Sequence, residues 1–466
     1  MEEFSELSLC KLTMTKNKVI SLKEFIIIGF PIFSYNIISF LFTIVDSLMI
    51  APLGKEYLGA IGQAGIFFTV SLIFFQGILS MFIPLVSKFN KKDDNIVLRG
   101  YFLNSVGLAL FMAIPIVILN SFAGYFFTIF NQPEEVVILV ERYLSVLKWT
   151  AFWALSYTCF IHVLNIIDKS KYIVWTVVLS NVVNIIFNWI FIYGNLGAPA
   201  MGIEGSALAT NIARISVIIF LLLISKKMLP FNIFTKDKIT FDYEFIKEFI
   251  VKGIPKGISY VNEWFSSFVL VLFVGFGGVI SIASNQIGDL VSSLMYMIPQ
   301  AVSTVIVIVL SKVIKNNNEL YGITVKKLFL YGMTINILVA IITLVSLPNL
   351  IPLFSIEVGS DTYVLARNIL IVHIIFFPFY CLQYMNVSIL DSLLDTKWPS
   401  IMALLTTYIF VLPVAFLVAY HTKNPVYIWI IDGIGNVILA TAFYLRVLRI
   451  TKKPITYGGK NEQVLE

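Results

Sequence analysis

The stretch Phe25-Ile-Ile-Ile-Gly-Phe-Pro31 recurs 224 positions later as Phe249-Ile-Val-Lys-Gly-Ile-Pro255. At the same offset, Gln76 recurs as Gln300. Each copy of the motif is followed by enough apolar sequence for several membrane spans. Duplicated halves around a site near the bilayer midplane are typical of secondary transporters that work by alternating access. The repeat therefore predicts a membrane carrier built from two related halves.

The composition indicates an integral membrane protein. Of the 466 residues, 58% are hydrophobic and 13% are charged, and the mean hydropathy is +0.90. A soluble domain has about 25% charged residues. The net charge of +6 would suit a nucleic-acid partner, but the basic residues fall in short loops between apolar runs. We therefore exclude nucleic acid and expect the lipid bilayer as the surroundings of the chain.

Twelve apolar stretches are each long enough to cross a bilayer, which takes about 20 residues of helix. The predicted fold is all-α, with twelve transmembrane helices in two six-helix bundles related by the internal repeat. The expected spans are 25–50, 58–86, 97–120, 136–165, 172–194, 203–224, 246–273, 279–311, 322–350, 362–392, 398–420 and 426–448. The expected organisation is a cytoplasmic segment (1–24), an N-terminal bundle (25–224), a cytoplasmic linker (225–245), a C-terminal bundle (246–449) and a cytoplasmic tail (450–466).

The distribution of Lys and Arg predicts the orientation of these spans. When both termini and the loops after even-numbered spans are put on one side, that side carries 27 of the 33 basic residues. Basic residues accumulate on the cytoplasmic side of membrane proteins. We therefore expect a multi-pass protein of a prokaryotic plasma (inner) membrane with both termini in the cytoplasm.

Asp46 is the clearest polar candidate inside a predicted span. It shares one helical face with Asn36, Ser39 and Thr43. Ionisable groups in hydrocarbon are costly and commonly mark a pathway for ions or substrate. We interpret Asp46 as a carboxylate that binds a proton or Na⁺. The alternative is an acid at a helix end near the outer head groups.

The fifth and sixth spans supply expected partners for this acid. Asn181, Asn184 and Asn188 fall on one face of span 5, and Thr210 lies on span 6. Amide oxygens suit a hard cation such as Na⁺, and they also accept a hydrogen bond from a protonated carboxyl. The alternative is hydrogen bonding between helices. We take Asp46, Asn184 and Asn188 as the candidate Na⁺ ligands.

The second half carries different acids. Glu263 lies in span 7 near Tyr260, and Asp289 lies in a polar stripe of span 8. Two acids at this depth suggest a cationic substrate or a second coupling ion, the alternative being buried acids kept neutral by their neighbours. Asp432, in span 12, is assigned no role. The expected substrate-cavity residues are Glu263, Asp289, Asn36, Tyr260, Gln76 and Gln300.

Other polar groups point away from catalysis. His162 and His373 lie in different spans with no second metal ligand at a suitable spacing, so we expect packed or hydrogen-bonded imidazoles. Arg214, in span 6, is expected to pair with an acid. The three cysteines form no metal or disulfide pattern. The protein is thus predicted not to be an enzyme and to have no cofactor apart from a coupling ion.

Several stretches resemble the multidrug and toxic compound extrusion (MATE) family, and the likeness covers roughly residues 20–450. The strongest is Asn181-Val-Val-Asn-Ile-Ile-Phe-Asn-Trp-Ile-Phe-Ile-Tyr-Gly194, which continues from Gly197 to Thr210. It is similar to span 5 and the start of span 6 of that family. Val45-Asp-Ser-Leu-Met-Ile50 resembles its span 1 signature, and Gly253-Ile-Pro255 followed by Glu263 resembles its span 7 element.

The resemblance implies an antiporter that exports amphipathic or cationic organic compounds in exchange for Na⁺ or H⁺. It assigns ion coupling to Asp46 with Asn184 and Asn188, and matches Glu263 to a span 7 acid. Some members have Asp where this chain has Asn188, so a proton-only mechanism based on those members does not transfer directly. The alternative function is a flippase for a lipid or lipid-linked saccharide. We expect a monomer with a small organic substrate.

Overall fold

The computed structural model describes residues 20–88, 95–167, 169, 171–235, 243–316, 320–393, 395 and 397–451. The regular structure of these ranges is helical throughout. In chain order, the elements are α2 (Leu22–Ile50), η1 (Ala51–Leu53), α3 (Lys55–Leu79), α4 (Phe82–Lys88), α5 (Asn95–Ser121), α6 (Ala123–Ile129), α7 (Glu134–Leu147), α8 (Thr150–Ile166), α9 (Lys171–Tyr193), η2 (Asn195–Gly197), α10 (Ile203–Met228), α11 (Tyr243–Val274), η3 (Gly275–Gly277), α12 (Val279–Asn316), α13 (Tyr321–Leu350), η5 (Ile351–Phe354), α14 (Asp361–Ser392), α15 (Lys397–Leu405), η6 (Thr406–Val411), α16 (Leu412–Thr422) and α17 (Pro425–Thr451).

The predicted all-α membrane fold is confirmed. Within the described ranges, eleven helical stretches are long and apolar enough to cross a bilayer, and the bent pair α7–α8 brings the number to twelve. The predicted span 136–165 is this pair, which bends by 52° around Lys148 and Trp149. Span 11 contains a π-helical stretch, η6, directly before Pro413. A wider turn there accommodates a proline, which lacks the backbone N–H and crowds the preceding turn.

The first helix of each half packs along the second helix of the other half. α11 follows α3 so closely that a Cβ added to Gly77 would lie 2.7 Å from the Cα of Gly257. In the same way α2 packs on α12, where a Cβ on Gly29 would meet Val305 at 3.4 Å. Small residues allow helices to approach closely where no hydrophobic force drives them together. The repeated motif therefore lies on the helices that cross between the halves.

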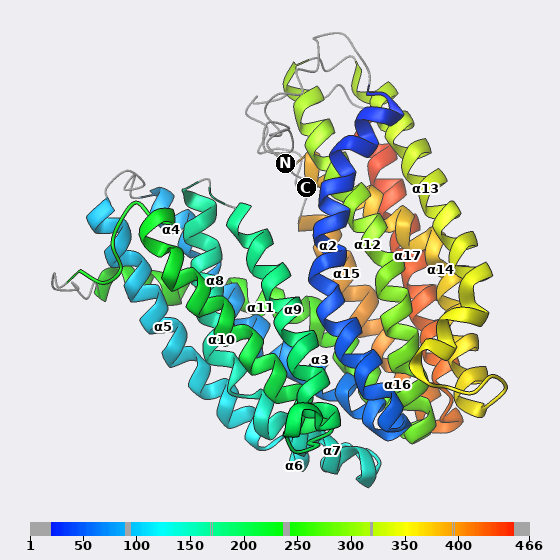
Figure 1. The fold of residues 1–466 in the computed structure, drawn as a ribbon. Helices are drawn as coiled ribbons and strands as arrows, with labels where there is room; N and C mark the ends of the chain where they lie inside the picture. Colours follow the sequence, from blue (N-terminus) through cyan, green and yellow to red (C-terminus); the bar gives the residue numbers. More distant parts are fainter. Residues whose placement is uncertain are drawn as a thin grey trace.

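Figure 1 shows how the two halves diverge. Helices α4, α5, α8 and α10 stand on one side, and α12, α13, α14 and α17 stand on the other. The two groups separate toward the end where α2 begins, and they come together toward the end where α6, α7 and α16 lie. The central polar sites described below lie between these two groups or within the second one.

Buried glutamines join the halves near the converging end. The Gln63 side chain (α3) donates to Gln132 Oε1 at 2.6 Å, and Gln132 donates to the Leu272 carbonyl of α11 at 3.1 Å. Gln63 is 1% exposed and Gln132 is 7% exposed. A further bond runs from Gln286 of α12 to Ser47 of α2 at 3.4 Å. These contacts connect α3 to α11 through Gln132, and α12 to α2, at this end.

Candidate functional site

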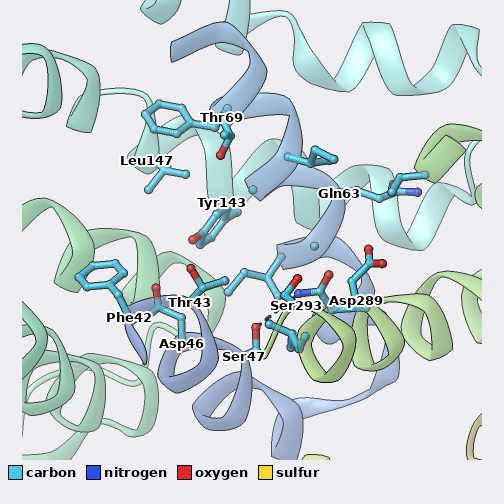
Figure 2. Close-up of a pocket in the computed structure, with 18 of the residues that line it drawn as sticks. Phe42, Thr43, Asp46, Ser47, Gln63, Thr69, Tyr143, Leu147, Asp289 and Ser293 are labelled. Carbon is cyan, nitrogen blue, oxygen red and sulfur yellow. Dashed lines mark hydrogen bonds between the residues drawn. The ribbon is translucent and has the colours of Figure 1, made fainter. Parts of the chain in front are cut away.

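A cavity of about 400 Å³ lies between the halves. Its walls come from α2, α3, α7, α8, α10, α11 and α12, so it touches both repeats. Figure 2 shows Thr43, Asp46 and Ser47 of α2 on one side of this pocket and Asp289 and Ser293 of α12 on the other side in this view. Two of the predicted acids, Asp46 of the first half and Asp289 of the second, therefore line one cavity.

Asp46 is buried and held by side chains from two other helices. It is 5% exposed, although it lines the cavity. Asn188 of α9 donates to its Oδ1 at 2.6 Å, and the Thr210 hydroxyl of α10 approaches its Oδ2 at 3.5 Å. Asn188 also donates to Asn184 Oδ1, one turn earlier in α9, at 3.2 Å. The structure thus brings together four of the five predicted ion-coupling residues.

The donor set of this cluster fits a small hard cation or a proton. It offers the Asp46 carboxylate, two amide oxygens and a hydroxyl, and oxygen ligands suit such cations. Asn184 Nδ2 and Asn188 Oδ1 are buried without a hydrogen-bond partner among the described residues. A buried polar group without a partner is costly. Na⁺ at this site would be held by the Asp46 carboxylate and by the amide oxygens of Asn184 and Asn188. Rotation of these amide groups would direct their oxygens toward the ion.

Asn181 lies on the same face of α9, but its side chain bonds to backbone carbonyls instead of to Asp46. Its side-chain nitrogen donates to the Ile38 carbonyl of α2 at 3.1 Å and to the Val177 carbonyl at 2.9 Å. It therefore ties α9 to the backbone of α2, about two turns before Asp46. Its position fits the alternative stated above for these amides, which was hydrogen bonding between helices.

Arg214 adds positive charge to the first cavity. It lines the same space as Asp46, and its guanidinium lies 5.0 Å from the centre of the Phe42 ring. Tyr143 of α7 also faces this cavity. The first cavity therefore contains one basic side chain together with the Asp46 carboxylate.

A second cavity of about 640 Å³ lies mainly in the second half. Asp289 of α12 lines both cavities, and Asp432 of α17 lines this one. Asn285 donates to Asp289 Oδ2 at 3.0 Å, and Asn436 donates to Asp432 Oδ2 at 3.0 Å. Trp429 in turn donates to Asn285 Oδ1 at 2.7 Å. The second half thus presents two carboxylates, each supported on one side by an amide.

Asp432 was not predicted as a site residue. Its signal is present in the sequence as Trp429, Asp432 and Asn436, a polar stripe at positions i, i+3 and i+7 of the last span. His373 also lines this cavity, and the Tyr296 hydroxyl lies 2.8 Å from its Nδ1. The expected hydrogen-bonded imidazole at this position is confirmed.

The other predicted substrate-cavity residues lie elsewhere. Asn36, Tyr260, Gln76 and Gln300 line neither of these two cavities. Gln76 donates to Thr158 at 3.5 Å, and the Tyr260 ring lies 5.1 Å from Lys256 Nζ. The side chain of Glu263 lies outside the described residues. Within the described part of the chain, no group of three or more His, Cys, Asp or Glu residues could hold a metal ion.

Comparison with known proteins identifies a matching family model and relatives that are similar over most of the chain. The family model described as MatE matches residues 31–190 and 255–417, one segment in each half. The probable multidrug resistance protein NorM of Bradyrhizobium diazoefficiens is 22% identical over 421 residues, which cover 88% of this chain and 89% of the relative. The same-named protein of Listeria innocua is 24% identical over 464 residues, which cover 95% of this chain and 97% of the relative.

Solved structures share the fold. An inward-facing conformation of a multidrug resistance MATE family transporter of the MOP superfamily is similar with a TM-score of 0.73 and 19% identity, covering 89% of this chain and 96% of that chain. An outward-facing conformation of such a transporter is similar with a TM-score of 0.63 and 19% identity, covering 93% of this chain and 98% of that chain.

Proposed function

The chain belongs to the MatE family and is a multidrug efflux transporter, and we propose that it is a secondary active antiporter exporting amphipathic or cationic organic compounds in exchange for Na⁺ or H⁺. The observation that carries this proposal is the buried carboxylate of Asp46, which side chains of α9 and α10 surround. Such a carboxylate inside a span is costly unless it serves ion binding or pairing. In a carrier of this family, ion binding is the use that explains its polar shell.

Ion binding at Asp46 would act on helix packing. The carboxylate connects α2 to α9 through Asn188 and to α10 through Thr210. Neutralising its charge with H⁺ or Na⁺ changes which of these hydrogen bonds are favourable. A ligand shifts a conformational equilibrium only by binding the two states with different affinity. We therefore propose that the ion favours one arrangement of α2, α9 and α10, and that cargo favours the other.

The cavities suit uncharged or cationic cargo. Their described lining includes three acids, Asp46, Asp289 and Asp432, and one basic residue, Arg214. A lipid-linked pyrophosphate would need more positive charge than this lining offers. The lining therefore supports export of organic compounds over the flippase alternative.

The arrangement of the halves supports an inward-open state. The halves separate toward the end where α2 begins, and the distribution of Lys and Arg favours the cytoplasm for that end. The larger TM-score to an inward-facing transporter than to an outward-facing one agrees with this assignment. In this state cargo would enter from the cytoplasm, and the glutamine contacts at the converging end would close the path outward. We propose that the protein does this as a monomer in the inner membrane.

The test is export of ethidium from cells expressing the protein, with a Na⁺ gradient and a pH gradient imposed separately. Export that follows one gradient, and that is lost in Asp46→Asn, would support the proposal and identify the coupling ion. The matched control is Asp361→Asn, which changes an exposed acid in the first turn of α14. Normal gradient-driven export by Asp46→Asn would contradict the proposal, provided that the variant is present in the membrane in the wild-type amount.

A further inference from the structure

The second cavity has an unusual balance of charge. Asp289 and Asp432 project from different helices, α12 and α17, and its described lining contains no Lys or Arg. Both carboxylates line this one cavity, so two like charges share the same space. A buried charge without a partner is costly in a medium of low dielectric constant. A ligand with a single positive charge neutralises one carboxylate and leaves the other without a partner.

Each carboxylate has room for one more partner. The amides of Asn285 and Asn436 each donate to Oδ2 of their acid. Oδ1 of each acid accepts no hydrogen bond from the described residues, and both acids are half-buried rather than closed off. This contrasts with Asp46, whose two oxygens both have polar side chains nearby. Two carboxylate oxygens therefore remain for a ligand.

Aromatic side chains form much of the remaining wall. The Tyr296 and Tyr380 rings stack with centroids 4.2 Å apart, and Tyr384 lies 4.6 Å from Tyr380. All three line the cavity, together with Trp429. Aromatic faces bind flat apolar bodies by dispersion and attract cations through the ring quadrupole. The wall thus suits an aromatic ligand with delocalised positive charge.

We propose that the second cavity is a binding site for flat aromatic compounds with two positive charges, one charge held by Asp289 and the other by Asp432. A dication makes the pair of acids electrically neutral, which a monocation does not. The inference rests on the proposed function insofar as such compounds are the exported cargo. Asp432 is then a residue that determines specificity, by the number of charges on the ligand.

The test is fluorescence titration of purified protein in detergent with the flat dication 4′,6-diamidino-2-phenylindole, alongside the monocation ethidium. Asp432→Asn should weaken binding of the dication by about tenfold or more, as for loss of a charge-assisted contact, and should change ethidium binding by less than about threefold. Asp432→Glu, which keeps the charge, should restore most of the dication affinity. Asp361→Asn serves as the matched control.

Two outcomes would overturn the inference. One is unchanged dication binding in Asp432→Asn, and the other is an equal loss of affinity for both dyes. A loss of both dyes through misfolding is recognised by thermal unfolding, and the folded Asp432→Glu variant then carries the comparison. Because the titration needs no ion gradient, it separates this inference from the proposed function. Dication binding that depends on Asp432, in a protein that exports nothing, would refute the transport proposal alone.

Discussion

The polar interiors of the two halves differ although one repeated motif begins both. In the first half, Asp46 is 5% exposed, and side chains of α9 and α10 lie at both of its oxygens. In the second half, Asp289 and Asp432 each take one amide and face an aromatic-walled cavity of about 640 Å³. A small, crowded shell suits a small ion, whereas a roomy one suits an organic molecule. We infer that the two halves share a scaffold, and that the first half binds the ion while the second half binds the cargo.

The largest effect that tests this division is expected from Asp46→Asn. The amide keeps the size of the side chain but can neither take up a proton near neutral pH nor offer a full negative charge to Na⁺. Gradient-driven export should fall by roughly 100-fold, the upper range of coupling between two sites, while dye binding in detergent stays within about threefold of wild type. Parallel export and titration experiments measure both. Loss of dye binding by a folded variant would show that the two sites are not divided in this way.

A smaller effect is expected from Asn188→Ala. It removes the 2.6 Å hydrogen bond to Asp46 and one candidate oxygen ligand. The ion concentration that gives half-maximal export should rise by about 10-fold to 100-fold, because contacts to a charged group are strong. Asn181→Ala is the matched control, since that amide contacts backbone carbonyls of α2 and α9 instead. An equal effect of both changes would assign the asparagines to helix packing.

The twelve spans and the Asp46 cluster could be predicted because their signals are local. Long apolar runs mark the spans, and residues three or four apart share a helical face. Asn181 shows the limit of that argument, because it lies seven residues before Asn188. At about 1.5 Å per residue, these amides are separated by about 10 Å along the helix. One carboxylate cannot reach both, so Asn181 bonds to the backbone of α2.

Features that depend on helix partners could not be predicted from the spans. Hydropathy does not say that α11 packs along α3, because a long apolar run marks a span without indicating its neighbours. The polar stripe of Asp432 is visible in the sequence, but its partner is not, because only the fold brings Asp432 into one cavity with Asp289 of α12. The bend at Lys148 and Trp149 is another such case, since the predicted span contains no Pro or Gly to indicate it.

The aromatic wall of the second cavity gives a third, smaller effect. Tyr380→Ala removes a ring that stacks on Tyr296 at 4.2 Å. Binding of ethidium and of the dication should both weaken by about fivefold, the scale of one aromatic contact, and the response of export to ions should not change. Tyr380→Phe keeps the ring and should bind both dyes almost as wild type does. An altered ion response in Tyr380→Ala would contradict the separation of the two sites.

The smallest effect is expected where the two halves meet. Gln132→Leu removes the hydrogen bonds to Gln63 and to the Leu272 carbonyl. If the bond to Leu272, which joins the two halves, exists only while the converging end is closed, its loss should favour opening of that end by about fivefold, since a hydrogen bond contributes about 1 kcal/mol net. Spin labels at Ala200→Cys and Val358→Cys, with Cys10 replaced by Ser, would report the distance between the halves there.

Gln63→Leu and the double variant complete the measurement as a double-mutant cycle. Because the two glutamines bond to each other, the effect of the pair should be smaller than the sum of the single effects. A label distance distribution that does not change in either single variant would mean that the glutamines stabilise both states equally. In that case the packing of α3 against α12, where a Cβ on Gly59 would lie 2.9 Å from Ile282, would have to close the outward path without them.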